Sequence, residues 1–313
     1  IVKLLGAEHG TEGGTLRMDG VKLILESNEA ISLNGTVAVA SNSTLYSEGK
    51  ESDMARNIND LRIENGATLT VDEHSWSTIW NIDKISGKGT LHWNSNTTHS
   101  TPSVLKLNGE GDFVGSIQLN RIYDKEKRKY GAFIELLSDN IAQHADISLT
   151  GNSANSVASL VIKTDNAHIK GLSGNVHALV YAGDALAETP EDNPAVPTTT
   201  RKATLTIDTA GNNYSYAGVF GHAVESADLG LSIVKLGAGT QAFTGTTVVN
   251  DVTVQEGALQ FATDTTTLRG DINLSTGATL SGINYVLGAD KSFIVEYGVD
   301  AAASFSGNLT LGG

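Results

Sequence analysis

Short runs of alternating apolar and polar residues recur along most of the chain. Residues 68–71 (TLTV), 146–150 (DISLT) and 203–208 (ATLTID) are clear examples. An alternation with a period of two places one set of side chains on each face of an extended backbone, and therefore predicts short β-strands. A helical period never persists beyond about ten residues, and residues 132–142 are the one mild candidate. The pattern predicts an almost entirely β protein.

Glycine turns divide these runs at a regular interval. Three turns, at Gly237, Gly257 and Gly277, follow one another every 20 residues. Turns of the same kind occur upstream, at intervals of 21 and 22 residues, at Gly66, Gly87 and Gly109. A turn followed by a short strand, repeated at a fixed interval, is typical of a solenoid in which each coil stacks on the next. We therefore expect coils of about 20 residues.

Residues 233–261 (IVKLGAGTQAFTGTTVVNDVTVQEGALQF) carry the most regular part of this pattern. The segment resembles the autotransporter-associated β-strand repeat, the passenger repeat of proteins secreted across the outer membrane of Gram-negative and related bacteria. The matching residues are Lys235, Gly237, Gly239, Thr240, Gly245, Thr247, Val249, Gly257 and Leu259. Gln241 stands where the repeat usually has Leu, and the central Tyr-Gly turn is missing. The resemblance implies a parallel β-helix on a secreted or surface-anchored protein, and no catalytic residue.

We therefore expect one all-β domain over residues 1–313, folded as a right-handed parallel β-helix. Apolar side chains of successive coils should stack into ladders, because only the stack as a whole excludes water. The predicted ladder residues are Leu69, Val71, Leu91, Leu107, Ile147, Leu149, Val161, Leu205, Ile207, Leu259 and Leu280. Three segments should leave the coils as loops: the polar residues 41–60, the basic residues 121–130 and the proline-rich residues 183–201.

Composition limits the classes of function. The chain has 35 acidic and 21 basic residues, a net charge of −14, which opposes binding to nucleic acid or to anionic lipid. It has no cysteine, so in a secreted protein its stability would come from the stacked coils alone. No apolar run approaches the roughly 20 residues of a membrane helix, and we expect no membrane insertion of this segment.

The two ends of the sequence also suggest a passenger. Ile1 is preceded by no Met or leader, and Gly312-Gly313 falls in the middle of the repeat pattern. We therefore expect a mature segment that is secreted or held at the bacterial surface, tethered through a region C-terminal to it.

Two groups of side chains are candidates for ligand contact. Trp76, Trp80 and Trp93 would form core if buried, which is usual for large aromatics, or a platform for stacking sugars if exposed together. The second group lies in the basic run and would belong to a solvated loop or contact an anionic glycan or another partner. Its members are Arg121, Lys125, Lys127 and Arg128.

A carbohydrate-active enzyme is a competing hypothesis, because β-helices also carry polysaccharide lyases and glycosidases. Glycoside hydrolysis needs two carboxylates about 5–10 Å apart. Asp165 and Asp208 would meet this need if they lay on facing coils, although turn aspartates more often bond their own backbone. The eight histidines lack metal-site spacing, and no Gly-x-Ser-x-Gly or phosphate-binding loop is present, so we expect no metal and no cofactor.

The leading hypothesis is a non-catalytic passenger domain for adhesion or ligand presentation. Its partners would be host or environmental glycans or surface proteins. The alternatives are a glycoside hydrolase or lyase and a purely structural stalk.

Overall fold

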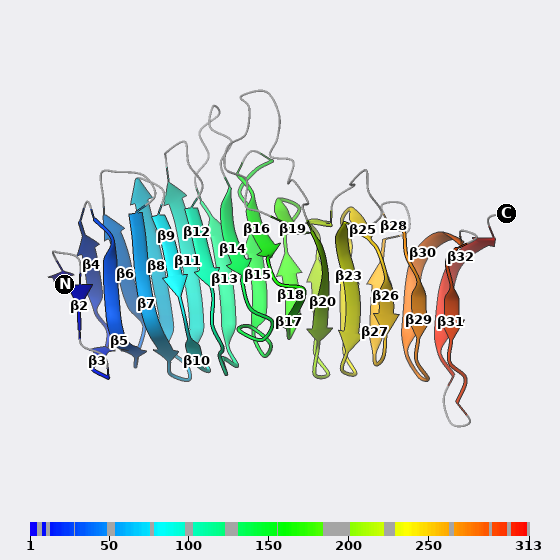
Figure 1. Cartoon of the computed structure of the whole chain (residues 1–313), viewed down its shortest axis with the longest axis horizontal. Helices are drawn as coiled ribbons and strands as arrows, with labels where there is room; N and C mark the ends of the chain where they lie inside the picture. The colour runs from blue at the N-terminus through cyan, green and yellow to red at the C-terminus, as the bar shows by residue number, and fades with distance from the viewer. Residues whose placement is uncertain are drawn as a thin grey trace.

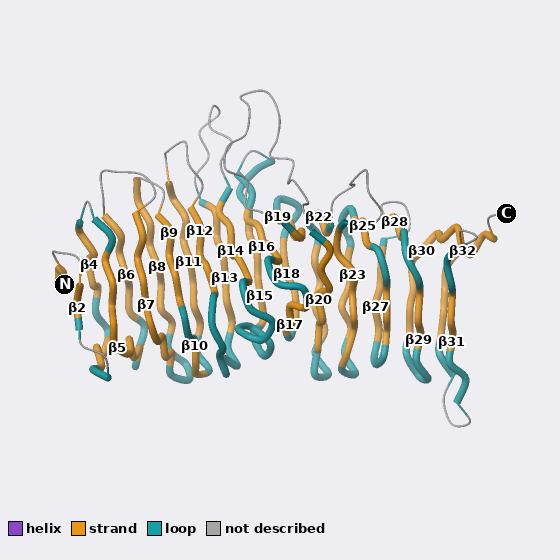
Figure 2. Tube along the Cα trace, viewed as in Figure 1, coloured by secondary structure: helices purple, strands orange, loops and turns teal. Residues whose placement is uncertain are grey.

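The computed structural model describes most of the chain: residues 1–4, 8–10, 13–27, 29–48, 54–75, 78–97, 103–122, 131–154, 156–183, 201–221, 229–262, 266–287, 290–298 and 302–311. Figure 1 shows these residues as one elongated stack of strands that runs from the N-terminus to the C-terminus. Strands and turns account for this part of the chain, and no helix is found in it (Figure 2).

Three parallel sheets run along the stack. Sheet A extends from one end of it to the other and has thirteen strands: β1 (Val2–Leu4), β4 (Lys22–Glu26), β6 (Ser43–Glu48), β8 (Thr68–Ser75), β11 (Thr90–Thr97), β13 (Ser116–Arg121), β15 (Asp146–Thr150), β18 (Gly171–Gly174), β21 (Asn213–Tyr216), β24 (Thr240–Phe243), β27 (Ala258–Phe261), β30 (Thr279–Leu287) and β32 (Ser304–Leu311).

Sheet B also has thirteen strands: β2 (Glu8–His9), β3 (Thr15–Met18), β5 (Ile31–Val39), β7 (Met54–Ile63), β9 (Thr78–Ile82), β10 (Ile85–Gly87), β12 (Ser103–Leu107), β14 (Ala132–Leu136), β16 (Ala158–Ile162), β19 (Ala178–Ala182), β22 (Val219–Phe220), β25 (Thr247–Val249) and β28 (Thr266–Leu268). Sheet C has six strands: β17 (Asn166–Ile169), β20 (Lys202–Asp208), β23 (Gly230–Leu236), β26 (Val252–Val254), β29 (Ile272–Leu274) and β31 (Phe293–Val295).

The pairing confirms the predicted all-β parallel solenoid. Neighbouring strands in each sheet are not consecutive in the chain, so each sheet takes its strands from successive coils. The predicted coil length is close for the C-terminal coils, where Thr240 pairs with Ala258 and Ala258 with Thr279. Other coils are longer, as in the pairing of Ser116 with Asp146, and the spacing over the solenoid is about 25 residues.

Inward-facing side chains form the predicted ladders. One column on sheet A runs through Leu45, Val71, Trp93, Leu119 and Leu149, each paired with the next. All eleven predicted ladder residues are buried. Val161 is the exception in position, because it lies in a separate apolar cluster with Val104, Phe133, Leu179 and Tyr181.

The glycine turns are coil corners, as predicted. Gly237, Gly257 and Gly277 have φ angles of 71°, 68° and 78°, in the left-handed region that favours glycine. A Cβ atom at Gly257 would also collide with the carbonyl oxygens of Gly237 and Gly239 in the corner below. The buried ammonium of Lys235 joins two corners by donating to the carbonyls of Leu236 and Gly237 (both 2.6 Å) and of Glu256 (3.2 Å).

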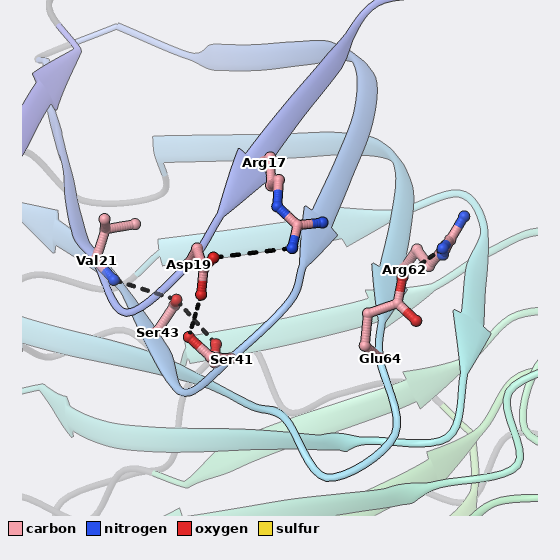
Figure 3. A network of polar contacts seen from close by, with 7 residues as sticks. All are labelled: Arg17, Asp19, Val21, Ser41, Ser43, Arg62 and Glu64. Atoms are coloured by element: carbon pink, nitrogen blue, oxygen red, sulfur yellow. Dashed lines mark hydrogen bonds and ion pairs between the residues drawn. The ribbon is translucent and has the colours of Figure 1, made fainter.

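Short polar side chains join the corners near the N-terminus (Figure 3). Ser41 Oγ donates to Asp19 Oδ1 in the preceding coil at 2.8 Å. Ser43 Oγ donates to the Ser41 carbonyl at 3.0 Å and accepts the Val21 N–H at 3.3 Å. Ion pairs of Arg17 with Asp19 and of Arg62 with Glu64 lie on the exposed side of these turns.

The expected loop at residues 41–60 is wrong for most of its length. β6 and the first part of β7 occupy residues 43–48 and 54–60 and pair with their neighbours in sheets A and B. The strand alternation was hidden because polar residues take inward positions: Ser43 and Ser47 in β6, and Arg56 in β7. Residues 49–53 lie outside the described residues.

The other two expected loops fall largely outside the described residues. β13 ends at Arg121, and residues 123–130 and 184–200 are not among those described. Gly174 of sheet A pairs with Tyr216, and the sequence separation between these two residues is far longer than between paired residues of other coils. An insertion at residues 183–201 is compatible with this pairing. Residues 132–136 of the mild helical candidate form strand β14.

Candidate functional site

The described tryptophans are core residues and offer no sugar-stacking surface. Trp80 and Trp93 are 1% and 0% exposed. Trp93 occupies the inward column of sheet A between Val71 and Leu119. The core interpretation is therefore confirmed for these two residues, and the platform interpretation is wrong for them. Trp76 lies outside the described residues.

Arg121 also points into the solenoid, so the prediction that it contacts a ligand is wrong. It is 3% exposed, and its Nη1 donates to the carbonyl and to the hydroxyl of Ser95, both at 3.2 Å. Its position in β13 places it on the inward side, in register with Ser95 of β11. Lys125, Lys127 and Arg128 lie outside the described residues.

Arg121 belongs to a polar column inside the solenoid that the sequence did not reveal. Ser47, Glu73, Ser95 and Arg121 are paired in that order on β6, β8, β11 and β13. Burial raises the pKa of Glu73 to about 7; the hydroxyls of three nearby residues and the charge of Arg121 act against this rise. The hydroxyls belong to Ser103, Thr78 and Ser95.

Arg56 adds a second guanidinium to this buried group. It is 1% exposed, and it donates to the carbonyls of Glu29 (3.0 Å) and Ser27 (3.2 Å) and to Ser47 Oγ (3.3 Å). Burial lowers its pKa to about 10, and the charge of Glu73 acts in the opposite direction. The group is enclosed by the coils, and its two guanidinium groups donate to the backbone carbonyls and serine hydroxyls around them.

The register excludes Asp165 and Asp208 as a hydrolytic pair. Asn166 of β17 pairs with Thr204 of β20, so Asp165 lies beside Ala203, while Asp208 is at the far end of β20. Five residues of extended strand therefore separate the two aspartates, or about 16 Å. This exceeds the separation that glycoside hydrolysis needs.

Both aspartates have structural partners instead. Asp165 Oδ1 accepts a hydrogen bond from Arg201 Nη2 at 2.8 Å, and Asp208 Oδ1 accepts the Ala210 N–H at 3.1 Å. The second contact is the local turn bond that short polar residues commonly make. Within the described ranges, no three His, Asp or Glu side chains come together as a metal site.

The outer side of sheet A forms a regular polar surface over six neighbouring strands, β6, β8, β11, β13, β15 and β18. Figure 1 shows these strands following one another in this order along the stack. Three columns of outward residues cross these strands, and we call them together the polar face. The columns are Thr44, Thr70, His92, Gln118, Ser148 and Ser173; Tyr46, Asp72, Asn94, Asn120 and Thr150; and Thr68, Thr90, Ser116, Asp146 and Gly171. All but the buried Gly171 are half-buried or exposed, although the Oδ1 atom of Asn94 is itself buried without a hydrogen-bond partner.

The centre of the polar face is close to electrically neutral. Burial lowers the pKa of His92, so its imidazole is neutral at pH 7, and Asn120 Nδ2 donates to His92 Nε2 at 2.8 Å. Asp146 is balanced by the ammonium of Lys170 at 3.2 Å and also accepts a hydrogen bond from the Tyr214 hydroxyl. Asp72 is the remaining carboxylate in the three columns.

A tyrosine lies at each end of the polar face. Tyr46 ends one column at β6, and the Lys22 ammonium lies 3.8 Å from its ring centroid. The Tyr214 ring lies against Gly171 of β18, where a Cβ atom would collide with it. Burial and the contact with Asp146 raise the pKa of Tyr214, so its hydroxyl stays protonated and can donate.

The chemistry of the polar face suits binding rather than bond cleavage. Its hydroxyl, amide and imidazole groups can donate and accept hydrogen bonds without carrying charge. Sequence reasoning missed it because each strand contributes at most three ordinary polar residues, and the surface exists only after the register aligns them. The available signal was the alternation itself, as in Thr68, Thr70 and Asp72 of β8.

Comparison with protein-family models, with curated proteins and with solved structures gave no match to this chain. The resemblance of residues 233–261 to a passenger repeat therefore rests on the residues quoted for it. In the part of the chain that the structure describes, no helix has the length and hydrophobicity needed to cross a bilayer.

Proposed function

We propose that this chain is a non-catalytic passenger domain, secreted or displayed on a bacterial surface, that serves adhesion or ligand presentation. The observation that carries the proposal is sheet A, which continues from β1 to β32 and makes one elongated body with a repeated outer surface. Such solenoids present extended binding surfaces, because each coil adds the same kind of face to the stack.

Two further features support the proposal. The chain has no cysteine, which suits passage through an outer-membrane pore before folding. The passenger-repeat residues Lys235, Gly237 and Gly257 form the corners of stacked coils, with Lys235 holding the carbonyls of two corners. Under this proposal the partners are host or environmental glycans or surface proteins, and a region C-terminal to this segment tethers it.

The decisive experiment exposes the purified chain to a panel of mucins and polysaccharides and records both the retained protein and any released oligosaccharide. Retention without release is expected. Release of oligosaccharide would contradict the proposal and favour a hydrolase or lyase, and neither retention nor release would favour a structural stalk.

Export is tested separately from binding. The chain is expressed in a Gram-negative host between a secretory leader and an outer-membrane translocator, and intact cells are then treated with protease. Accessibility of the chain on intact cells is expected, whereas retention in the periplasm would argue against a passenger.

A further inference from the structure

We propose that the polar face of sheet A binds an extended neutral polysaccharide that lies along the solenoid axis. This inference rests on the proposed adhesive function and adds to it the location of the site, the class of glycan and its orientation.

The polar groups recur along the face at the spacing of the strands. Neighbouring strands of a sheet are about 4.8 Å apart, so each column offers a polar group at that interval along the axis. The length of a sugar ring with its linkage is similar, so a polysaccharide lying along a column can present hydroxyls to each strand in turn. From β6 to β18 the polar face spans about 24 Å, which is long enough for several sugar rings.

The width of the face also suits a sugar ring. Outward side chains of one strand are two residues, or about 6.6 Å, apart, so adjacent columns can contact the two edges of one sugar ring. His92 and Asn94 occupy such neighbouring positions on β11, and Gln118 and Asn120 occupy them on β13. A ligand lying across the columns, along one strand, would meet only two or three of these groups.

The charges on and around the polar face favour an uncharged ligand. The His92 imidazole is neutral, Asp146 is paired with Lys170, and the central positions carry amides and hydroxyls. The protein as a whole has a net charge of −14, which repels sulfated or uronic-acid polymers. The polar face can therefore bind the uncharged hydroxyl groups of a ligand without the electrostatic repulsion that an acidic polymer would meet.

An aromatic ring stands at each end of the polar face. The rings of Tyr46 and Tyr214 stand at β6 and over β18, and both carry a polar hydroxyl on an apolar ring. Aromatic side chains of this kind suit contact with the apolar faces of sugar rings. The two rings thus define where a bound chain would begin and end.

The test measures binding of fluorescent neutral polysaccharides (mannan, xylan and a β-glucan) and of acidic ones (polygalacturonate and chondroitin sulfate). The variants Asn94→Ala and Gln118→Ala remove central groups of the polar face. Asn273→Ala and Thr253→Ala are matched controls, because these residues are half-buried, face outward and pair with each other on sheet C.

We expect binding to at least one neutral polysaccharide, weakened about fivefold by each polar-face substitution, as for the loss of one hydrogen bond. The control variants should bind like the unmodified chain, and added salt should have little effect because no charge pairing is involved. Affinity for oligosaccharides should rise with length up to the span of the face and then level off. Circular dichroism and melting curves verify that all four variants fold.

The outcomes separate this inference from the proposed function. If the unmodified chain binds no glycan and no surface protein, the adhesive function itself fails. If it binds neutral polysaccharide but the polar-face and control variants behave alike, the location is wrong while the function stands. Salt-sensitive binding to the acidic polymers alone would overturn the ligand class.

Discussion

Gln241 offers the sharpest test of the structure, because the passenger repeat that residues 233–261 resemble usually has Leu at this position. Its side chain is 0% exposed on β24 of sheet A. The amide reaches past β21 to β18, where Oε1 accepts the Leu172 N–H at 3.1 Å and Nε2 donates to the Leu172 carbonyl at 3.0 Å. Gln241 thus supplies the two hydrogen bonds that a neighbouring strand would normally give.

The reason lies in the irregular pairing of β18 with β21. These strands are in register only through Gly174 and Tyr216. Tyr214, which would otherwise lie beside Leu172, turns outward to cover Gly171 and bond Asp146. A buried backbone N–H and C=O would therefore lack partners without the Gln241 amide.

We predict that Gln241→Leu destabilises the protein, although it introduces the residue that is usual in the repeat this segment resembles. Two buried backbone groups without partners cost about 1–3 kcal/mol each. Burial of the leucine side chain offsets about 1.5–3 kcal/mol of this cost. The net loss is on the order of 2 kcal/mol, which corresponds to a decrease of several degrees in Tm.

The assay combines thermal melting with hydrogen exchange resolved to single amides. The Leu172 amide should exchange faster in Gln241→Leu, and the change should concentrate on β18, β21 and β24. Gln260→Leu on the next strand, β27, is the matched control, because Gln260 pairs with Ala242 and is exposed. An unchanged or higher Tm for Gln241→Leu, with Leu172 still protected, would refute the reasoning.

Three further predictions test the ladders, the corners and the buried charges. Leu149→Asp places a carboxylate in the core and should strongly lower the Tm, whereas Thr150→Asp on the exposed side should not; equal melting curves would contradict the assigned alternation. Lys235→Met removes the ammonium donor from three corner carbonyls; those of Leu236 and Gly237 keep their contacts with Thr209, whereas that of Glu256 loses its donor. The change should cost about 1–3 kcal/mol in chemical denaturation, against little change for the exposed Lys88→Met. The folded pKa of Glu73, about 7, lies above its unfolded value of 4.5. The protonated form of Glu73 therefore contributes about 3 kcal/mol to the free energy of unfolding. This contribution is fully present below pH 4.5 and is lost as the pH rises through 7. Glu73→Gln should flatten this part of the pH–stability curve, and an unaltered pH dependence would show that another group is responsible.

Much of the fold could be predicted because each strand and each corner of the solenoid is specified by residues that are close together in the sequence. The alternation around Leu69 and Leu149 gave the inward columns, and the glycine spacing at 237, 257 and 277 marked coil corners that need a positive φ. The coil length was less predictable, because corners tolerate insertions without disturbing the sheets. Residues 43–48 and 54–60 were wrongly expected to be loop because Ser47 and Arg56 face inward, which no apolar pattern reveals.

The candidate site was harder to predict, since it depends on register rather than on motifs. Asp165 and Asp208 looked compatible with catalysis until the pairing of β17 with β20 placed them at opposite ends of the strands. Arg121 and Trp93 looked like ligand contacts by residue type, but the parity of β13 and β11 turns both inward. A shift of one residue in either strand would have exposed them. The same alternation directs His92 and Asn120 outward, where they form a hydrogen bond between adjacent coils. In a solenoid, therefore, the alternation along each strand decides whether a residue faces the core or the solvent. Outward residues form a binding surface only when the register of neighbouring coils aligns them.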